Sequence, residues 1–310
     1  PKLMSLASEV VDGLGRIDEL LKRAGELGFE ALALTDHGNL YGAIEFYQKA
    51  KKAGIKPIIG CEIYIAYERM QDKRPGIDDK RYHLTLLAEN SEGYQNLIEI
   101  VTKAHLEGFY YKPRVDKDTL RKHAKGLIAL SGCLNSEISR AIRSGKLDQA
   151  RKLIGGYQDI FGRDNFFLEL GAHKNIPEQT VVNAALIELS KETGAPLVGV
   201  NDVHYVRADD RAAQDILVSV QTGSRIEDEE RLTMKANDFS LKSTQEMAEF
   251  FKDTPEAIEN TWKIAERVNI EIPLGKTRFP KFDVPEGFSA DSYLEKLANE
   301  NLLRRYAADL

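Results

Sequence analysis

Short apolar segments rich in β-branched residues alternate along the chain with segments in which apolar residues recur every three or four positions. The first kind is typical of buried strands, and the second of helices that pack one face on a sheet. We predict strands at 31–35, 57–66, 83–88, 127–132, 166–170 and 196–201. This alternation indicates repeated β–α units, so we expect an α/β fold with a largely parallel sheet.

Signals for helix ends agree with this interpretation. Pro177 and Pro255 suit the first turn of a helix, and Gly223 follows the helical segment 211–222 at a position where a left-handed cap is expected. Six or seven β–α repeats favour a barrel. An open, doubly wound sheet would give a similar pattern, so closure of the barrel is inferred from the number of repeats alone.

The pattern changes near the end of the chain. After about residue 245 it becomes helical, with one helix expected at 254–268, and three prolines between 272 and 287 then indicate an extended linker. A final amphipathic helix follows. We therefore expect a barrel domain with its late helix over 1–270, a Pro-rich linker over 271–288, and the first helix of a following domain over 289–310.

Composition narrows the class of protein. No apolar stretch approaches the roughly 20 residues that cross a bilayer, and the first residues lack the pattern of a secretory signal. The two cysteines imply no disulfide framework, so we expect a soluble, cytoplasmic chain without a membrane partner. The net charge of −6 argues against indiscriminate binding to nucleic acid, although it leaves room for a local site.

One segment, 67–81, mixes both signs of charge with Pro75 and Gly76. This composition is typical of a solvated, mobile loop.

Side chains that bind cations gather near the ends of the predicted strands, where functional groups collect in parallel α/β folds. They are Asp36 and His37 after the first strand, Cys61 and Glu62 in the second, Cys133 after the fourth, and Asp202 and His204 after the sixth. His83 begins its strand instead. It fits the same cavity only if that strand starts where its neighbours end.

Asp202 and His204 are two residues apart, so in an extended strand they point the same way and can bind one cation. Taken alone, a buried histidine bonded to its neighbouring carboxylate is the plainer interpretation. Adding His37, Glu62 and His83 favours a metal site, because a hydrophobic barrel mouth would need cations to neutralise so many ionisable groups. Nitrogen and carboxylate donors suit Zn²⁺, Mn²⁺ or Fe²⁺, and phosphoester hydrolysis is the natural chemistry.

Several longer segments resemble one family. They are TDHGNLYGAIEFYQKAKKAGIKPIIGCEIYIA, HLTLLAENSEGYQNLIEI, EGFYYKPRVD, GLIALSGCLNSEI and NDVHYV. Over nearly the whole chain the sequence resembles the polymerase and histidinol phosphatase (PHP) domain of bacterial replicative DNA polymerase III alpha subunits. The resemblance implies a distorted (β/α)₇ barrel with a cluster of up to three metal ions.

The resemblance also implies the metal ligands, which are Asp12, His37, Glu62, His83, Cys133, Asp202 and His204. The chain departs from the family pattern H-x-H-[ST]-E-x-S-L-L-D-G at its start. The two histidines of that pattern fall on Leu3 and Ser5, or on Ser5 and Ala7 if two residues are deleted, and no histidine precedes His37. We therefore expect a partly degraded site with Zn²⁺ or Mn²⁺ in smaller number than three.

Three further residues are candidates for a supporting or substrate-binding role. Asp36 precedes a predicted ligand. His173 is either such a group or a simple loop histidine. Arg114, together with Tyr110, Tyr111 and Lys112, could contact a phosphate, with a packed loop as the alternative.

For function, the resemblance implies a domain that precedes the polymerase palm and lacks the palm carboxylates, and no residue is assigned as catalytic with certainty. One hypothesis is a structural and docking domain. The other is a metal-dependent 3′–5′ exonuclease or pyrophosphatase that acts in proofreading. The implied partners are the rest of the alpha chain, DNA, a proofreading exonuclease subunit and a sliding clamp.

Overall fold

The computed structural model describes residues 4–7, 13–235, 237–275 and 282–306 of the 310-residue chain. The chain divides into two compact units, Pro1–Glu271 and Ile272–Leu310. The second unit contains one described helix, α11 (Ala290–Tyr306). None of the helices in the described ranges combines the length and apolar character that crossing a bilayer demands.

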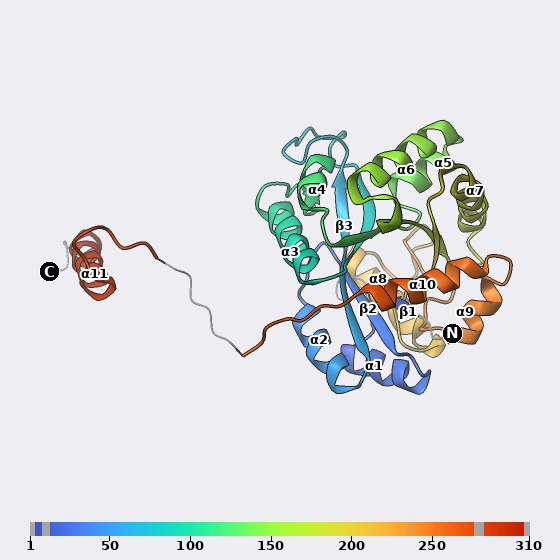
Figure 1. Cartoon of the computed structure of the whole chain (residues 1–310), viewed down its shortest axis with the longest axis horizontal. Helices are drawn as coiled ribbons and strands as arrows, with labels where there is room; N and C mark the ends of the chain where they lie inside the picture. Colours follow the sequence, from blue (N-terminus) through green and yellow to red (C-terminus); the bar gives the residue numbers. More distant parts are fainter. Residues whose placement is uncertain (1–3, 8–12, 236, 276–281, 307–310) are drawn as a thin grey trace. The chain divides into compact units, whose positions relative to one another are not determined.

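A curved, mixed sheet with flanking helices forms the centre of the first unit (Figure 1). Its strands are β1 (Met4–Ala7), β2 (Ala31–His37), β3 (Lys56–Ala66), β4 (Arg81–Ala88), β5 (Arg114–Val115), β6 (Leu127–Leu130), β7 (Phe166–Gly171) and β8 (Leu197–Val200). They pair in the order β1-β2-β3-β4-β6-β7-β8, with β5 attached to β3. The predicted α/β fold is confirmed, and the sheet takes the form of a half-barrel.

Strand β4 runs against its neighbours. It is antiparallel to both β3 and β6, whereas all other pairs in the sheet are parallel. No helix lies between β3 and β4, and without such a crossover the chain can only return antiparallel. The start of β4 therefore lies at the edge of the sheet where β2 and β3 approach their ends, with His83 opposite Tyr64.

The helices cover the sheet with apolar faces. They are α1 (Ile17–Glu26), α2 (Ala43–Lys52), α3 (Ser91–Leu106), α4 (Lys117–His123), α5 (Glu137–Arg143), α6 (Leu147–Phe161), α7 (Pro177–Thr193), α8 (Arg211–Thr222), α9 (Thr244–Phe250) and α10 (Pro255–Arg267). Pro177 and Pro255 begin α7 and α10, and Gly223 ends α8 in the left-handed conformation, as predicted. In α1, Ile17, Leu20, Leu21 and Ala24 form the buried face.

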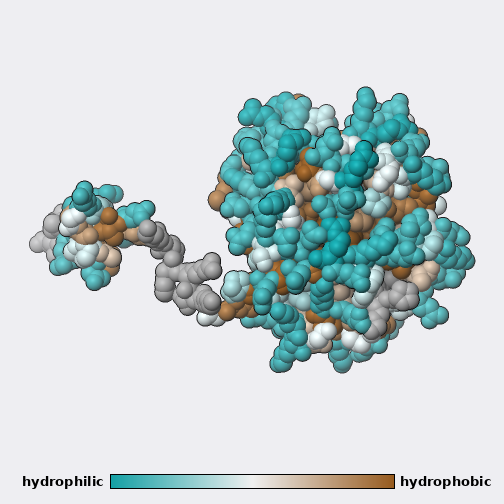
Figure 2. All heavy atoms as spheres, in the orientation of Figure 1, coloured by the Kyte–Doolittle hydropathy of each residue, from teal (hydrophilic) through white to brown (hydrophobic). Residues whose placement is uncertain are grey.

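The core is formed by strands whose residues are buried on both faces. Strands β6, β7 and β8 are buried along their whole length, and in β3 only the first residue is partly exposed. This explains why the sequence shows continuous apolar runs and little alternation. Hydrophilic residues dominate the face of this unit that Figure 2 shows, with apolar atoms in small groups between them.

Candidate metal centre

Three side chains from adjacent strands form the centre of the site. His37 ends β2, Glu62 lies in β3, and His83 lies near the start of β4. His37 and Glu62 are register partners in the parallel β2–β3 pair, which places their side chains on the same face. One donor atom from each of the three residues lies within 4.8 Å of the others. The reversal of β4 thus brings His83 to the predicted cavity.

Cys133 joins this trio from the loop after β6. Its Sγ lies 3.4 Å from His83 Nδ1 and 3.9 Å from Glu62 Oε1. The preceding Gly132 has a φ of +83°, and a Cβ there would come within 2.7 Å of the His83 carbonyl oxygen. Only glycine therefore lets the loop approach β4 closely enough. Burial, followed by the negative charge of Glu62, raises the pKa of the Cys133 thiol well above its usual range.

A second group of donors follows β8. Asp202 Oδ1 lies 3.8 Å from His204 Nδ1, and Asp202 Oδ2 lies 3.9 Å from His173 Nε2. His204 Nδ1 also lies 3.1 Å from the Asp202 backbone carbonyl oxygen, which can only accept, so His204 would bind a cation through Nε2. Burial would raise the pKa of Asp202, but the His204 and His173 imidazoles and the charge of His37 outweigh it and hold that pKa well below its usual range. Asp202 is therefore close enough to His37 for their charges to interact.

The backbone at Asp202 has an uncommon conformation. Its φ of +50° lies in the left-handed region, which non-glycine residues seldom adopt and aspartate adopts more often than most of them. Residues with such dihedral angles cluster at functional sites, where surrounding contacts enforce them.

The donor set fits a divalent cation. Ligands held about 2.0–2.3 Å from a tetrahedral Zn²⁺ lie about 3.3–3.8 Å from one another. His37 Nδ1 lies 3.5 Å from Glu62 Oε1, and the distance of 3.4 Å from Cys133 to His83 is also in this range. Glu62 Oε1 and His83 Nδ1 contact each other directly, so these two atoms would have to separate to bind one ion. Imidazole, carboxylate and thiol donors are ligands that Zn²⁺ accepts together. His37, Glu62, His83 and Cys133 could therefore hold such an ion.

Not every predicted residue joins the cluster. Asp12 lies outside the described residues. Asp36 is buried, and its Oδ2 accepts a hydrogen bond of 3.1 Å from the Gly42 backbone N–H just before α2. Burial raises its pKa to about 6. Asp36 thus supports the turn into α2.

The contacts of Arg114 are those of a residue that supports a loop. Its guanidinium is fully buried and donates to the carbonyl oxygens of Gly108, Asp78, Met70 and Asp72 at 3.1, 2.5, 3.1 and 2.9 Å. Three of these carbonyls belong to the connection between β3 and β4. The packed-loop alternative is the one that matches these contacts, because a buried guanidinium with four acceptors cannot reach a phosphate.

Two residues of the site escaped the sequence analysis. Glu169 of β7 is buried, and burial followed by the charges of Glu62 and Asp202 raises its pKa to about 8. A single charge in the apolar segment FFLEL was the signal that could have indicated it. Asn237 contacts His173 from a loop 64 residues further along the chain, and no sequence spacing points to it.

A basic pocket of about 560 Å³ lies beside the centre. His37 and His83 line it together with Tyr64, Arg81 and Lys112, and residues of α8 also contribute. The Arg81 guanidinium and the Lys112 ammonium each lie 5.9 Å from the centre of the Tyr64 ring. Within the part of the chain that the structure describes, neither cation pairs with a carboxylate. The pocket therefore places two positive charges, which no described carboxylate neutralises, next to the metal donors.

Curated relatives of this chain carry one name. DNA polymerase III subunit alpha of Borreliella burgdorferi is 44% identical over 300 residues, which cover 96% of this chain and 26% of that protein. DNA polymerase III subunit alpha of Thermus aquaticus is 43% identical over 307 residues, which cover 96% of this chain and 25% of that protein. The chain spans about a quarter of the length of these relatives.

Two solved structures and one family model also match parts of the chain. An amidohydrolase from Chromobacterium violaceum aligns with a TM-score of 0.47 and 14% identity, over 65% of this chain and 87% of that one. A putative metal-dependent phosphoesterase from Bifidobacterium adolescentis aligns with a TM-score of 0.40 and 12% identity, over 80% and 96%. The model of the PHP domain matches residues 6–173, more than half of the chain. The chain belongs to the PHP domain family.

Proposed function

We propose that this chain is the PHP domain of a bacterial DNA polymerase III alpha subunit. Similarity to two proteins of that name over 96% of the chain supports the proposal. In this proposal, residues 1–270 are the barrel domain with its late helix, 271–288 the linker, and 289–310 the first helix of the palm region. The parent protein would copy DNA in the cytoplasm, together with a proofreading exonuclease subunit and a sliding clamp.

The domain itself would serve mainly as a structural and docking domain with a reduced metal site. The observation that carries this proposal is the contrast between strands. The sequence of β1, MSLA, has no imidazole, thiol or carboxylate, whereas β2, β3, β4 and the loop after β6 still contribute His37, Glu62, His83 and Cys133. A cation bound there would join these elements and stabilise the folded domain, because the unfolded chain has no such site.

Metal analysis of the purified chain, combined with thermal unfolding, tests the proposal. We expect at least one Zn²⁺ or Mn²⁺ per chain, but fewer than three, and a lower Tm after chelation, since free metal at 100 times its Kd adds about 2.7 kcal/mol of stability. Glu62→Gln should lose the metal. Glu188→Gln, at an exposed position of α7, is the matched control. If the purified protein contains no metal and its Tm does not change on adding a chelator, the proposal of a structural metal site is wrong.

The basic pocket favours a second candidate, a metal-dependent 3′–5′ exonuclease or pyrophosphatase. Arg81 and Lys112 lie where they could bind phosphate oxygens next to the metal donors. Bound metal would supply an activated water for attack on phosphorus. Asp202, which lies between the His173 and His204 imidazoles, would then help to hold a cation.

Hydrolysis of end-labelled single-stranded DNA and of pyrophosphate with Mn²⁺ separates the two candidates. A working phosphoesterase should lose turnover in Asp202→Ala and show a raised KM in Lys112→Gln. Turnover that is equal in Asp202→Ala and the parent would come from a contaminating nuclease and would count against this candidate.

A further inference from the structure

His173 has one ring nitrogen that the fold leaves without a hydrogen bond. The residue follows β7 and is 5% exposed. Its buried Nε2 makes no hydrogen bond within the described residues. It faces Asp202 Oδ2 at 3.9 Å, a distance too long for a hydrogen bond but short enough for both atoms to bind one cation.

The other ring nitrogen of His173, Nδ1, is held in place by a neighbouring side chain. Asn237 is 6% exposed, and its carboxamide contacts His173 Nδ1 at 2.6 Å. The Phe239 ring lies 4.5 Å from the His173 ring and 5.3 Å from the His204 ring, so one aromatic side chain positions the two imidazoles that flank Asp202. Histidines that bind metals typically have this arrangement, with one nitrogen toward the ion and the other fixed by a polar neighbour.

We propose that His173 Nε2 is a ligand of a divalent cation at Asp202 and that Asn237 is the positioning residue that controls it. This inference rests on the proposed metal site. A nitrogen donor from β7 would partly replace the imidazoles that β1 lacks. The site would then have two donor groups, one around Glu62 and one formed by His173, Asp202 and His204.

The orientation of the Asn237 carboxamide decides which form of His173 exists. When its NH₂ group donates to Nδ1, the imidazole carries its proton on Nε2 and cannot bind a cation. When the carboxamide turns by about 180°, Oδ1 accepts the proton of Nδ1 and the Nε2 lone pair becomes available. Cation binding therefore requires the second orientation.

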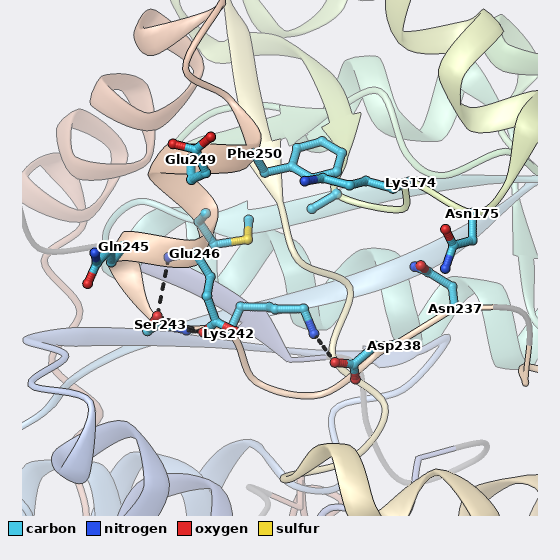
Figure 3. Close-up of a pocket in the computed structure, with 12 residues that line it drawn as sticks. Lys174, Asn175, Asn237, Asp238, Lys242, Ser243, Gln245, Glu246, Glu249 and Phe250 are labelled. Atoms are coloured by element: carbon cyan, nitrogen blue, oxygen red, sulfur yellow. Dashed lines mark hydrogen bonds and ion pairs between the residues drawn. The ribbon is translucent and has the colours of Figure 1, made fainter.

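The surroundings of Asn237 permit this rotation. Asn237 lines a cavity of about 520 Å³ together with Lys174, Asn175, Lys242 and Phe250 (Figure 3). The amide atom that turns away from His173 therefore meets a polar, solvent-accessible space. It does not become a buried group without a partner, which would cost about 1–3 kcal/mol.

Titration of the metal-free protein with Co²⁺, followed by visible absorption, tests the inference without any activity assay. Asn237→Asp offers only acceptor oxygens, so it should fix the proton on Nδ1 and tighten Co²⁺ binding by about tenfold or more. Asn237→Leu should weaken binding by about 10–100-fold. His173→Gln should remove one nitrogen donor and change the absorption band. The matched control is His123→Gln in α4.

The outcomes separate this inference from the proposed function. Parent protein that binds no cation would overturn both. Parent protein that binds Co²⁺ with the same Kd and the same absorption band as His173→Gln would overturn this inference alone. The tighter binding expected of Asn237→Asp cannot arise from misfolding, so the test remains decisive even if the other variants fold poorly.

Discussion

At the residue scale, Asp215 shows how one carboxylate fixes a long connection. It is fully buried in α8 and accepts from Arg231 at 2.9 and 2.5 Å, from Thr233 at 2.6 Å and from Lys235 at 2.9 Å. The Arg231 hydrogen bonds are the main reason why the pKa of Asp215 lies well below its usual range, although burial opposes them. These contacts fix the segment 231–235, in which Leu232 and Met234 line the basic pocket.

Asp215→Asn should lower the free energy of unfolding by about 1–3 kcal/mol, because it weakens the charge-assisted hydrogen bonds from Arg231 and Lys235. The folded-state pKa is depressed, so the stabilisation is complete above the unfolded value of about 3.9 and is lost as pH falls below it. Urea unfolding should show a constant difference from pH 8 to 5 that shrinks in more acid solution. Asp209→Asn, at an exposed site, is the control, and a difference that grows in acid would contradict this account.

The sequence predicted some residues of the site and not others for a physical reason. His37 and Cys133 lie at or shortly after strand ends and Glu62 lies inside β3, and hydrophobic runs locate strands to within a few residues. The trio of His37, Glu62 and His83 does lie together. Asn237 depends on how a distant loop packs, which no local pattern encodes. Cys61 precedes the predicted ligand Glu62 in β3 and is fully buried. Because successive residues of a strand face opposite sides of the sheet, its side chain and that of Glu62 lie on different faces.

At the element scale, the direction of β4 is the main feature that the sequence could not provide. A buried strand is apolar on both faces, so its residues look the same whichever way it runs. One local feature did indicate the direction of β4: the segment between β3 and β4 lacks apolar residues at helical spacing, so no crossover helix is expected there. The ends of strands were also imprecise: the predicted segment 127–132 is a strand only over Leu127–Leu130.

Two glycines within helices should respond in opposite ways to the same change. A Cβ on Gly93, in the first turn of α3, would lie 1.7 Å from the Gly126 carbonyl oxygen, whereas a Cβ on Gly156 of α6 would meet nothing within 4 Å. Gly93→Ala should therefore destabilise the protein by about 1–3 kcal/mol or more. Gly156→Ala should stabilise it by about 1 kcal/mol through helix propensity. Thermal unfolding of both variants checks this contrast, and equal Tm values would refute it.

At the scale of the whole molecule, the class of fold followed from the alternation of strands and helices, and the structure confirms it. The number of repeats indicated a barrel and the family resemblance a distorted one, and the described strands form a curved half-barrel with flanking helices. The described helix of the second unit, α11, leaves Leu294 and Leu302 exposed. Its own sequence supplies no apolar surface that could cover them.

The four hydrogen bonds of Arg114 also bear on how the folded molecule withstands a protease. By composition, the connection between β3 and β4 is a good trypsin substrate, with Arg69, Lys73 and Lys80 along it. A protease must draw a stretch of extended chain into its cleft, and the buried guanidinium holds three carbonyls of this connection in place.

We therefore expect trypsin to spare this connection in the parent protein and to cut it in Arg114→Lys, whose single ammonium cannot serve four acceptors. Mass spectrometry of the first fragments would reveal the sites. Arg121→Lys, on the exposed face of α4, should leave the pattern unchanged. A segment that resembles disordered chain by its charges would then be among the more resistant parts of the domain.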